Sequence, residues 1–304
     1  MLTAFLKEIQ LAYPKARLTL LGPAKAKTLL EGSPMLTSLW CFNKKHFVGD
    51  DGWFQTLKRL KRHKFELIID ASNPTSPSTT QTILSLLGNA PHKLGFGNES
   101  AKSAYTLTAQ PLSADEHENL QRVQLLTALG YSPSSPQLPD LSHLTKVPQP
   151  KIENWLASEG IRSFIVLNIG ARLKEKQLDS NDYREIIDTI TGLERDVVLT
   201  FGPSELDLAE KARQGTSARL APRTNLLELA ALFHRADSVV TCDTGPMHLA
   251  VALNTPTCGI FVSTSPQRYG YQTDRHTSFD ARQGLKDDIK RALPDWVTST
   301  RTKA

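Results

Sequence analysis

The stretch SVVTCDTGPMHLAVAL, residues 238–253, predicts how the second half of the chain folds. Its first five residues form a strand-sized run of mainly β-branched and apolar side chains. Asp243, Thr244 and Gly245 then form a turn. Pro246 suits the first helical position, because the amide hydrogen that proline lacks would be unpaired there anyway. A strand, a tight turn and a helix in this order predict one unit of a parallel α/β sheet.

The turn that follows this strand is the strongest candidate for a binding site. The amides in the first turn of the helix, here those of Met247 and His248, lie at the positive end of the helix dipole, where a phosphate binds. Gly245 lets a ligand approach the backbone, and the His248 side chain is placed to donate to a phosphate oxygen. We expect Asp243 to accept from sugar hydroxyls. The alternative is that Asp243 and Thr244 only cap the helix and that His248 is a buried structural histidine.

Five further short apolar or β-branched runs alternate with amphipathic stretches along the chain. The runs lie at 18–21, 66–70, 164–168, 197–201 and 258–262, and the helical patterns lie at 117–130, 183–192, 204–213 and 225–236. This alternation is typical of parallel sheets that are covered by helices. Five prolines predict an extended linker over 132–150, between a domain at 1–140 and a domain at 151–304. Two such domains would enclose a cleft.

Composition limits the class of protein. The 304 residues suffice for two domains, and 39% hydrophobic with 22% charged residues is usual for a globular protein. Three widely spaced cysteines fit neither a disulfide framework nor a C-x-x-C zinc site. Lys7 and Glu8 interrupt the apolar run that a secretory signal would need, so the expected location is the cytoplasm. The formal net charge of +5 favours anionic partners.

Two loops that follow predicted strands carry further candidate residues. Lys176 lies in a basic loop after 164–168, where it could clamp a diphosphate, although lysines in loops are usually only solvated. Glu205 follows 197–201 and could hold a ribose diol, although a glutamate in the first turn of a helix also favours the helix dipole.

The segment 53–65 is a basic amphipathic pattern with Phe54, Leu57 and Leu60 on its expected inner face. It could meet anionic lipid or saccharide, or it could be only a solvated charged face. The chain lacks a dinucleotide-binding fingerprint, a Walker A loop and the usual patterns of metal ligands, so neither NAD nor a catalytic metal is expected.

Three longer segments of the second half resemble the glycosyltransferase family 9 heptosyltransferases, which attach heptose to the lipopolysaccharide inner core. The segments are FIVLNIGARLKEKQL (164–178), VVLTFGPSELDLA (197–209) and NLLELAALFHRADSVVTCDTGPMHLAVALNTPTCGIF (225–261). The resemblance implies the GT-B fold, in which two Rossmann-like domains face a cleft. The N-terminal domain would handle the acceptor, and the C-terminal domain would hold the ADP-sugar.

The resemblance also implies roles for single residues. Lys176 stands at the family's phosphate-contacting lysine, Glu205 at the acidic residue that faces the ribose, and Thr224 at a position where the family has methionine. The donor motif comprises Asp243, Thr244, Gly245, Pro246, Met247 and His248. Lys176 and His248 would stabilise the charge that develops on the departing diphosphate.

The implied reaction is an inverting, metal-independent transfer of heptose from ADP-heptose to a lipopolysaccharide core acceptor. No cofactor and no nucleic-acid partner are expected, and 53–65 would give a peripheral contact with the inner membrane. Family members open with a strand and a Gly-Asp loop whose aspartate is the proposed base, and this chain begins at the helix that follows. The first strand of the N-terminal domain and the base are therefore expected to be missing. The alternatives are a catalytically defective nucleotide-sugar-binding homologue and a GT-B-fold nucleotide-sugar epimerase.

Overall fold

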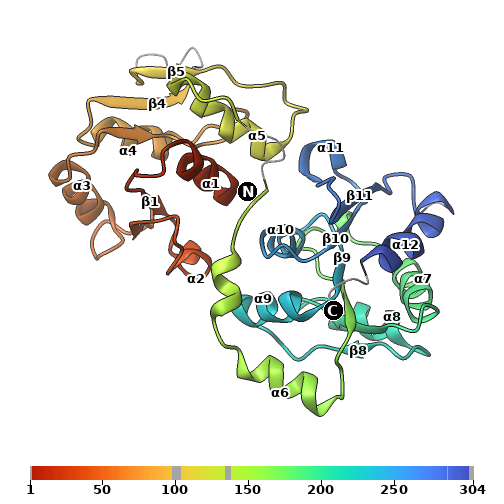
Figure 1. Ribbon diagram of the computed structural model, residues 1–304. Coiled ribbons are helices and arrows are strands. Elements are labelled where there is room, and N and C mark those ends of the chain that lie inside the picture. Colours follow the sequence, from red (N-terminus) through yellow and green to blue (C-terminus); the bar gives the residue numbers. More distant parts are fainter. Residues whose placement is uncertain (1, 98–103, 134–137, 286, 301–304) are drawn as a thin grey trace. The chain divides into compact units, whose positions relative to one another are not determined.

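The computed structural model describes residues 2–97, 104–133, 138–285 and 287–300. The chain divides into two compact units, Met1–Pro139 and Asp140–Ala304 (Figure 1). Each unit is an α/β structure whose strand pairs are all parallel. The predicted α/β class is therefore confirmed.

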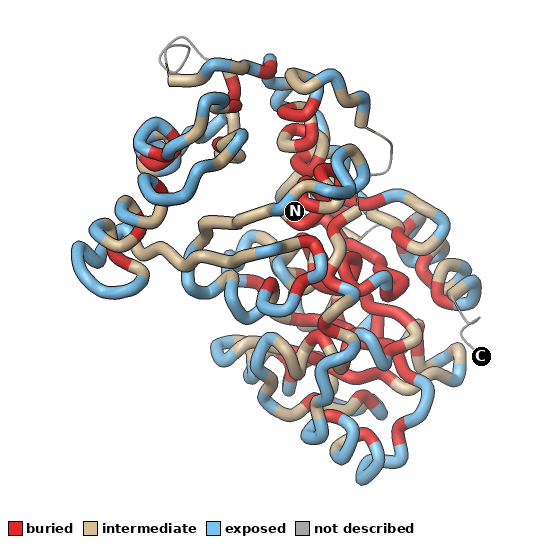
Figure 2. The backbone as a smooth tube through the Cα atoms, turned by 60° about the vertical axis from the view of Figure 1, so that its left-hand side comes forward, coloured by how far each residue is buried: buried red, intermediate tan, exposed pale blue. Residues whose placement is uncertain are grey.

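The second unit is built on one six-stranded sheet with the order β11-β10-β9-β6-β7-β8. The strands are β6 (Phe164–Asn168), β7 (Asp196–Thr200), β8 (Arg219–Leu220), β9 (Ser238–Cys242), β10 (Thr257–Phe261) and β11 (His276–Asp280). Every residue of β6, β9 and β10 is buried, which agrees with their apolar and β-branched sequences (Figure 2).

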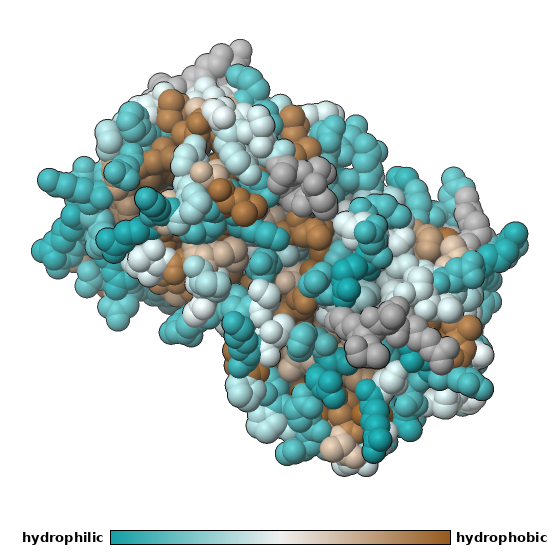
Figure 3. Space-filling view, in the orientation of Figure 1, coloured by the Kyte–Doolittle hydropathy of each residue, from teal (hydrophilic) through white to brown (hydrophobic). Residues whose placement is uncertain are grey.

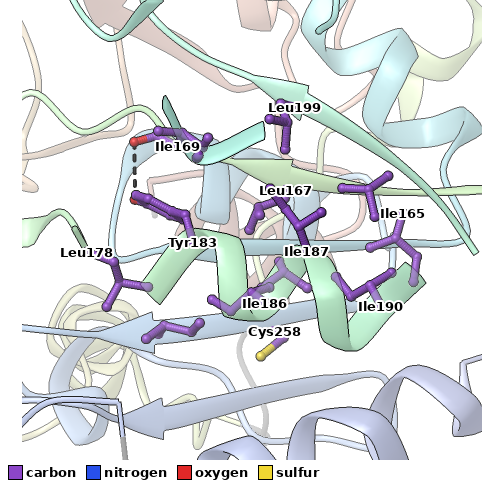
Figure 4. Packing of buried hydrophobic residues seen from close by; sticks show 14 of the residues in the cluster. Ile165, Leu167, Ile169, Leu178, Tyr183, Ile186, Ile187, Ile190, Leu199 and Cys258 are labelled. Atoms are coloured by element: carbon purple, nitrogen blue, oxygen red, sulfur yellow. Dashed lines mark hydrogen bonds between the residues drawn. The ribbon is translucent and has the colours of Figure 1, made fainter. Parts of the chain in front are cut away.

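The second unit also contains helices, several of which pack directly on the sheet. They are α6 (Pro150–Ser158), α7 (Ser180–Thr191), α8 (Leu206–Arg213), α9 (Leu226–Arg235), α10 (Gly245–Ala252), α11 (Pro266–Tyr269) and α12 (Asp287–Ser299), with the 3-10 helices η3 (Ser142–Lys146) and η4 (Lys174–Lys176). The buried residues of α7 recur at the helical spacing and form the centre of the core: Tyr183, Ile186, Ile187 and Ile190 (Figure 4). The Tyr183 hydroxyl donates to the Ile169 carbonyl at 3.2 Å, so the buried phenol is satisfied.

The extended linker predicted over 132–150 differs from the structure. Residues 134–137 lie outside the described residues. Leu141 and Leu144 are buried, and the segment between them forms part of η3. The Leu141 amide donates to the Ala252 carbonyl at 2.8 Å. The expected extended conformation is wrong for Ser142–Lys146, because the chain turns helically there and buries these leucines.

The first unit contains two small parallel sheets, β1-β2 and β3-β4-β5. The strands are β1 (Thr19–Gly22), β2 (Ser38–Cys41), β3 (Leu67–Ile69), β4 (His92–Phe96) and β5 (Leu107–Ala109). The helices are α1 (Leu2–Ala12), η1 (Ala24–Ala26), α2 (Lys27–Leu30), α3 (Trp53–Arg62), α4 (Thr79–Leu87), α5 (Glu118–Val123) and η2 (Gln124–Leu129). Among the described residues, β1 pairs only with β2, and β3 pairs only with β4.

One apolar cluster serves both of these sheets. Phe5 and Ile9 of α1 belong to it, and Leu18, which precedes β1, packs against it together with Leu67 and Ile69 of β3. The strands β1, β2 and β3 are only half-buried, in contrast to the central strands of the second unit. The strand predicted to be missing would belong to this unit, and the described residues place no strand on the second edge of β1 or of β3.

Candidate functional site

The candidate site lies in the second unit at the carboxyl ends of its strands. From β6 the chain crosses the sheet to β7 and β8, and it then returns to form β9, β10 and β11 on the other side of β6. The boundary between β6 and β9 is the switch point at which open α/β sheets bind ligands. Lys176 follows β6, Asp243 follows β9, and Thr264 follows β10.

These three residues form a compact polar cluster. Lys176 Nζ donates to Asp243 Oδ2 at 2.6 Å, and Thr264 Oγ1 donates to the same oxygen at 2.6 Å. His248 Nε2 lies 3.9 Å from the other carboxylate oxygen, Oδ1. The Asp243 side chain is 5% exposed and that of Lys176 is 25% exposed, so the pair is partly withdrawn from water. The structure thus brings together the predicted residues Lys176, Asp243 and His248.

Two tyrosines and a threonine at the site were not predicted from the sequence. The Tyr271 hydroxyl lies 2.9 Å from His248 Nδ1, and Tyr271 itself is buried. A proton on Nε2, which faces the carboxylate, leaves Nδ1 to accept from this hydroxyl. Lys176 Nζ lies 5.9 Å from the centroid of the Tyr269 ring. Thr264, Tyr269 and Tyr271 all follow β10, and loops after neighbouring parallel strands meet at one sheet edge, so this rule could have indicated them.

The turn after β9 differs in part from its prediction. Thr244 is the N-cap of α10 without a capping side-chain hydrogen bond, and Asp243 bonds Lys176 and Thr264 instead of the helix. Thr244 thus occupies the N-cap position without capping through its side chain, and the Asp243 carboxylate is engaged by Lys176 and Thr264. Met247 was predicted to offer its amide to a phosphate. It donates that amide to the Thr244 carbonyl at 3.1 Å, because the first turn closes on itself.

The remaining residues of this turn have different surroundings. The Met247 side chain is buried, and a Cβ on Gly259 would lie 2.7 Å from its sulfur, so glycine at that position leaves room for it. Gly245 is exposed, and a Cβ there would meet nothing within 4 Å, so the space beside it is open. Pro246 lies in the first turn of α10.

Glu205 and Thr224 form no hydrogen bond with the described residues of this cluster. Glu205 is the N-cap residue of α8, and its Oε1 accepts from the Ser204 hydroxyl at 2.8 Å. Thr224 is half-buried immediately before Asn225, the N-cap residue of α9. Among the described residues neither side chain bonds to Lys176 or Asp243. The roles of Glu205 and Thr224 in donor binding remain predictions.

A buried amide connects the loops beneath the site. Asn168, at the end of β6, accepts from the Thr200 hydroxyl of β7 at 3.0 Å. Its Nδ2 donates to the Gly170 carbonyl at 3.0 Å and approaches Thr241 Oγ1 of β9 at 3.2 Å. Because one side chain joins the ends of three strands, the loops that carry Lys176 and Asp243 start from fixed positions.

The thiols near the site are inert. Burial raises the pKa of Cys242 to about 11, and burial also raises the pKa of Cys258. Both thiols therefore stay protonated at neutral pH and supply no thiolate nucleophile. Within the described ranges, no three His, Cys, Asp or Glu side chains are grouped so that they could hold a metal ion. The metal-independent reaction nevertheless remains a prediction.

The first unit also holds a buried carboxylate after a strand. Asp70 follows β3 and accepts from the Tyr105 hydroxyl at 2.6 Å, from the Thr82 hydroxyl at 3.1 Å and from the Ser72 amide at 2.9 Å. Burial, and then the bond to Asp70, raise the pKa of Tyr105 to about 12, so its hydroxyl remains a donor.

Comparison with known proteins identifies the family of the chain. The family model described as "Glycosyltransferase family 9 (heptosyltransferase)" matches residues 53–293. Lipopolysaccharide heptosyltransferase 3 of Escherichia coli is 25% identical over an alignment of 281 residues, which covers 86% of this chain and 79% of that protein. Lipopolysaccharide core heptosyltransferase OpsX of Haemophilus influenzae is 25% identical over 286 residues, covering 87% of this chain and 76% of its own.

Solved structures show the same fold. A family 9 glycosyltransferase from Veillonella parvula superposes with a TM-score of 0.78 at 18% identity, over 99% of this chain and 93% of the other. The E. coli heptosyltransferase WaaC with ADP superposes with a TM-score of 0.76 at 17% identity, over 98% of this chain and 94% of the other. The predicted GT-B fold is confirmed by these structures, and the family model covers most of the chain. The chain belongs to glycosyltransferase family 9, the heptosyltransferase family.

Proposed function

We propose that the chain transfers heptose from ADP-heptose to the inner core of lipopolysaccharide, with inversion and without a metal ion. The cluster of Lys176, Asp243, Thr264 and His248 at the switch point carries this proposal. The relatives support it, since they are lipopolysaccharide heptosyltransferases. We place the reaction at the cytoplasmic face of the inner membrane.

The donor diphosphate would lie against Lys176 and His248. Lys176 is the half-buried lysine of η4, whereas Arg172 and Lys174 in the same loop are exposed. The Lys176 ammonium is paired with Asp243, so the charge is already held where the phosphates would arrive. Pairing reduces the cost of ordering a long side chain on binding.

Asp243 would orient the sugar. Its Oδ2 accepts from Lys176 and Thr264, while its Oδ1 faces His248 Nε2 at 3.9 Å, which is longer than a hydrogen bond. A sugar hydroxyl that donates to Oδ1 would fit beside the diphosphate. The carboxylate itself repels phosphate oxygens, which keeps the two ends of the donor apart.

The chemical step would be assisted by charge. In an inverting transfer the anomeric carbon becomes oxocarbenium-like while negative charge grows on the leaving diphosphate. Lys176 and His248 would stabilise that charge in a partly buried site, where fixed donors are most effective. Tyr271 would hold the His248 ring so that Nε2 carries the proton.

The proposal is tested by a transfer assay with ADP-heptose and truncated lipopolysaccharide acceptors, read by mass spectrometry. Lys176→Ala should lower kcat/KM about 100-fold or more, because it removes a donor to the developing charge. Lys174→Ala is the matched control from the same 3-10 turn, and it should retain the parent rate because its side chain is exposed.

Three outcomes would contradict the assignment. Equal rates for Lys176→Ala and the parent would remove Lys176 from the site. Binding of ADP-heptose by calorimetry without any turnover would favour a nucleotide-sugar-binding protein. Conversion of the donor in the absence of acceptor would favour an epimerase.

A further inference from the structure

The loop before α3 exposes apolar side chains to an unusual degree. Phe47 is 77% exposed and Val48 78%, and Phe54 in the first turn of α3 is 66% exposed. The next most exposed large hydrophobic side chain in the described part of the chain is Leu11, at 57%. We call Phe47, Val48 and Phe54 the apolar tip. Exposing three such side chains to water costs free energy, and exposed apolar patches are typical of binding surfaces.

The apolar tip is held by hydrogen bonds within its own loop. The Phe54 amide donates to the Phe47 carbonyl at 3.1 Å, and the Trp53 amide donates to the His46 carbonyl at 3.0 Å. Trp53 Nε1 also donates to the Lys44 carbonyl at 3.0 Å. These bonds close the loop on itself and fix Phe47 beside Phe54. The exposure is therefore a built feature of the loop.

Basic side chains continue from the apolar tip along α3. Lys58, Lys61 and Arg62 are exposed at the helical spacing from Phe54, while Thr56 and Leu60 are buried. Figure 3 shows hydrophilic side chains projecting over α3. The expectation that Phe54 faces inward was wrong, because Thr56 and Leu60 make the buried face and turn Phe54 outward.

The charge of this region is unbalanced. Residues 42–64 contain seven lysines and arginines and two aspartates, an excess of five, which equals the formal net charge of the whole chain. Asp51 Oδ1 lies 3.0 Å from His46 Nδ1, so one of the two aspartates is hydrogen-bonded within the same loop. The remainder of the chain is close to neutral, and its positive excess is concentrated beside the apolar tip.

We propose that the apolar tip and the basic face of α3 dock on an anionic lipid bilayer. Three apolar side chains are too few for a stable protein interface, which buries about 1,000 Å² or more. They suffice for shallow insertion among lipid headgroups when lysines and arginines bind the anionic surface. None of the described helices is long and apolar enough to cross a bilayer, so the contact would lie at the surface.

This proposal rests on the surface alone and not on the proposed function. One consequence does rest on the proposed function: a lipid-anchored acceptor would meet the chain at this surface. The test is co-sedimentation of the full chain with phosphatidylcholine vesicles, with and without phosphatidylglycerol, and with no donor present. We expect binding only to the vesicles that contain phosphatidylglycerol, and we expect it to weaken at high salt.

Two variants separate the two contributions. Phe47→Ser with Val48→Ser should weaken binding about tenfold or more at every salt concentration, since it removes inserted side chains. Lys58→Ala with Lys61→Ala should weaken binding about tenfold at low salt and reduce the salt dependence. Leu206→Ser with Leu226→Ser is the matched control, because these exposed side chains lie in the second unit, and it should bind like the parent.

The outcomes are distinct from those of the transferase assay. Circular dichroism is used to check that each variant is folded. Transfer is assayed with a short water-soluble acceptor, so that it does not depend on lipid. Binding equal for the tip variant and the parent would overturn the proposal, as would equal binding to vesicles without anionic lipid. Self-association that the tip variant abolishes would assign the surface to a second copy of the chain instead.

Discussion

Asp70 and Asp243 occupy corresponding places in the two units, each buried directly after a parallel strand and each accepting from a threonine hydroxyl. Their other partners differ in charge. Asp70 is bound by a phenol and a backbone amide, whereas Asp243 is bound by the Lys176 ammonium and faces an imidazole. The same strand-end position therefore carries a neutral network in one unit and a charged one in the other.

This difference bears on the strand end at which we propose that the diphosphate binds. A carboxylate surrounded by neutral donors holds its neighbours in place but offers a phosphate no positive charge. A carboxylate beside an ammonium keeps a cation available at a partly buried position. The contrast supports the proposal that the diphosphate lies beside Lys176 in the second unit, with Asp70 as a structural centre of the first unit.

The sheets that carry the two aspartates also differ in how deeply their strands are buried. The strands around Asp243 are fully buried in one continuous sheet, while β3, which leads to Asp70, is half-buried in a sheet of three strands. A continuous buried sheet fixes its loops more firmly, because each strand end is held from both sides. The proposed donor site therefore lies on the more deeply buried of the two sheets.

The largest expected effect compares the packing of the two sheets directly. Leu167→Ala, in fully buried β6, should lower the free energy of unfolding of the second unit by about 4 kcal/mol. Leu67→Ala, in half-buried β3, should cost the first unit about 1 kcal/mol, because less surface is buried and the site can relax. Urea unfolding followed by hydrogen exchange of peptides from each unit measures both losses.

Equal losses for the two leucines would show that half-burial in β3 does not reflect weaker packing. The peptides must be read unit by unit, since a chain of two units need not unfold in a single transition.

A smaller effect should appear on acidification, and it belongs to the second unit. Burial, and then the charge of Arg275, lower the pKa of His276 from 6.5 to about 4. The folded state keeps this imidazole neutral. The stability of the second unit is therefore full above pH 6.5, and it falls as the pH drops towards 4, where the unfolded chain binds a proton that the folded chain resists. The loss between pH 8 and pH 4 should be about 3 kcal/mol. His276→Phe should remove that part of the pH dependence of urea unfolding.

The first unit serves as the internal reference for this measurement. Its peptides should show the same pH dependence in the parent and in His276→Phe. If the second unit of the variant lost as much stability on acidification as the parent, His276 would not be the group responsible.

The second unit could be predicted from sequence further than the first. All six predicted strand runs form strands, among them β6, β9 and β10, because continuous buried runs are conspicuous in sequence. The prediction missed β2, β4, β5, β8 and β11. These lie at sheet edges or in the first unit, where a short strand such as β8, with two residues, carries little periodicity.

The site shows the same limit. Lys176, Asp243 and His248 follow recognisable runs and were predicted, and the structure places them together. Thr264 and Tyr271 were not predicted, because a single threonine or tyrosine in a loop has no pattern of its own. Only the order of the strands brings them to Asp243 and His248. The outward position of Phe54 depended in the same way on which face of α3 found a neighbour.

The smallest effect should distinguish the two threonine–aspartate pairs. Thr264→Val removes a hydroxyl that shares Asp243 Oδ2 with Lys176. Without that hydroxyl the Asp243 carboxylate is less firmly oriented, and so is the Lys176 ammonium where the diphosphate would arrive. We expect ADP to bind about tenfold more weakly, a change of about 1.4 kcal/mol, by calorimetry.

Thr82→Val is the matched control, since it removes the corresponding hydroxyl from Asp70. It should leave ADP affinity unchanged and lower the stability of the first unit by about 1 kcal/mol, because Tyr105 still donates to the carboxylate. Weaker ADP binding in both variants would contradict this expectation. A change confined to Thr264→Val would mean that the charge beside Asp243, rather than the position after a strand, makes the site.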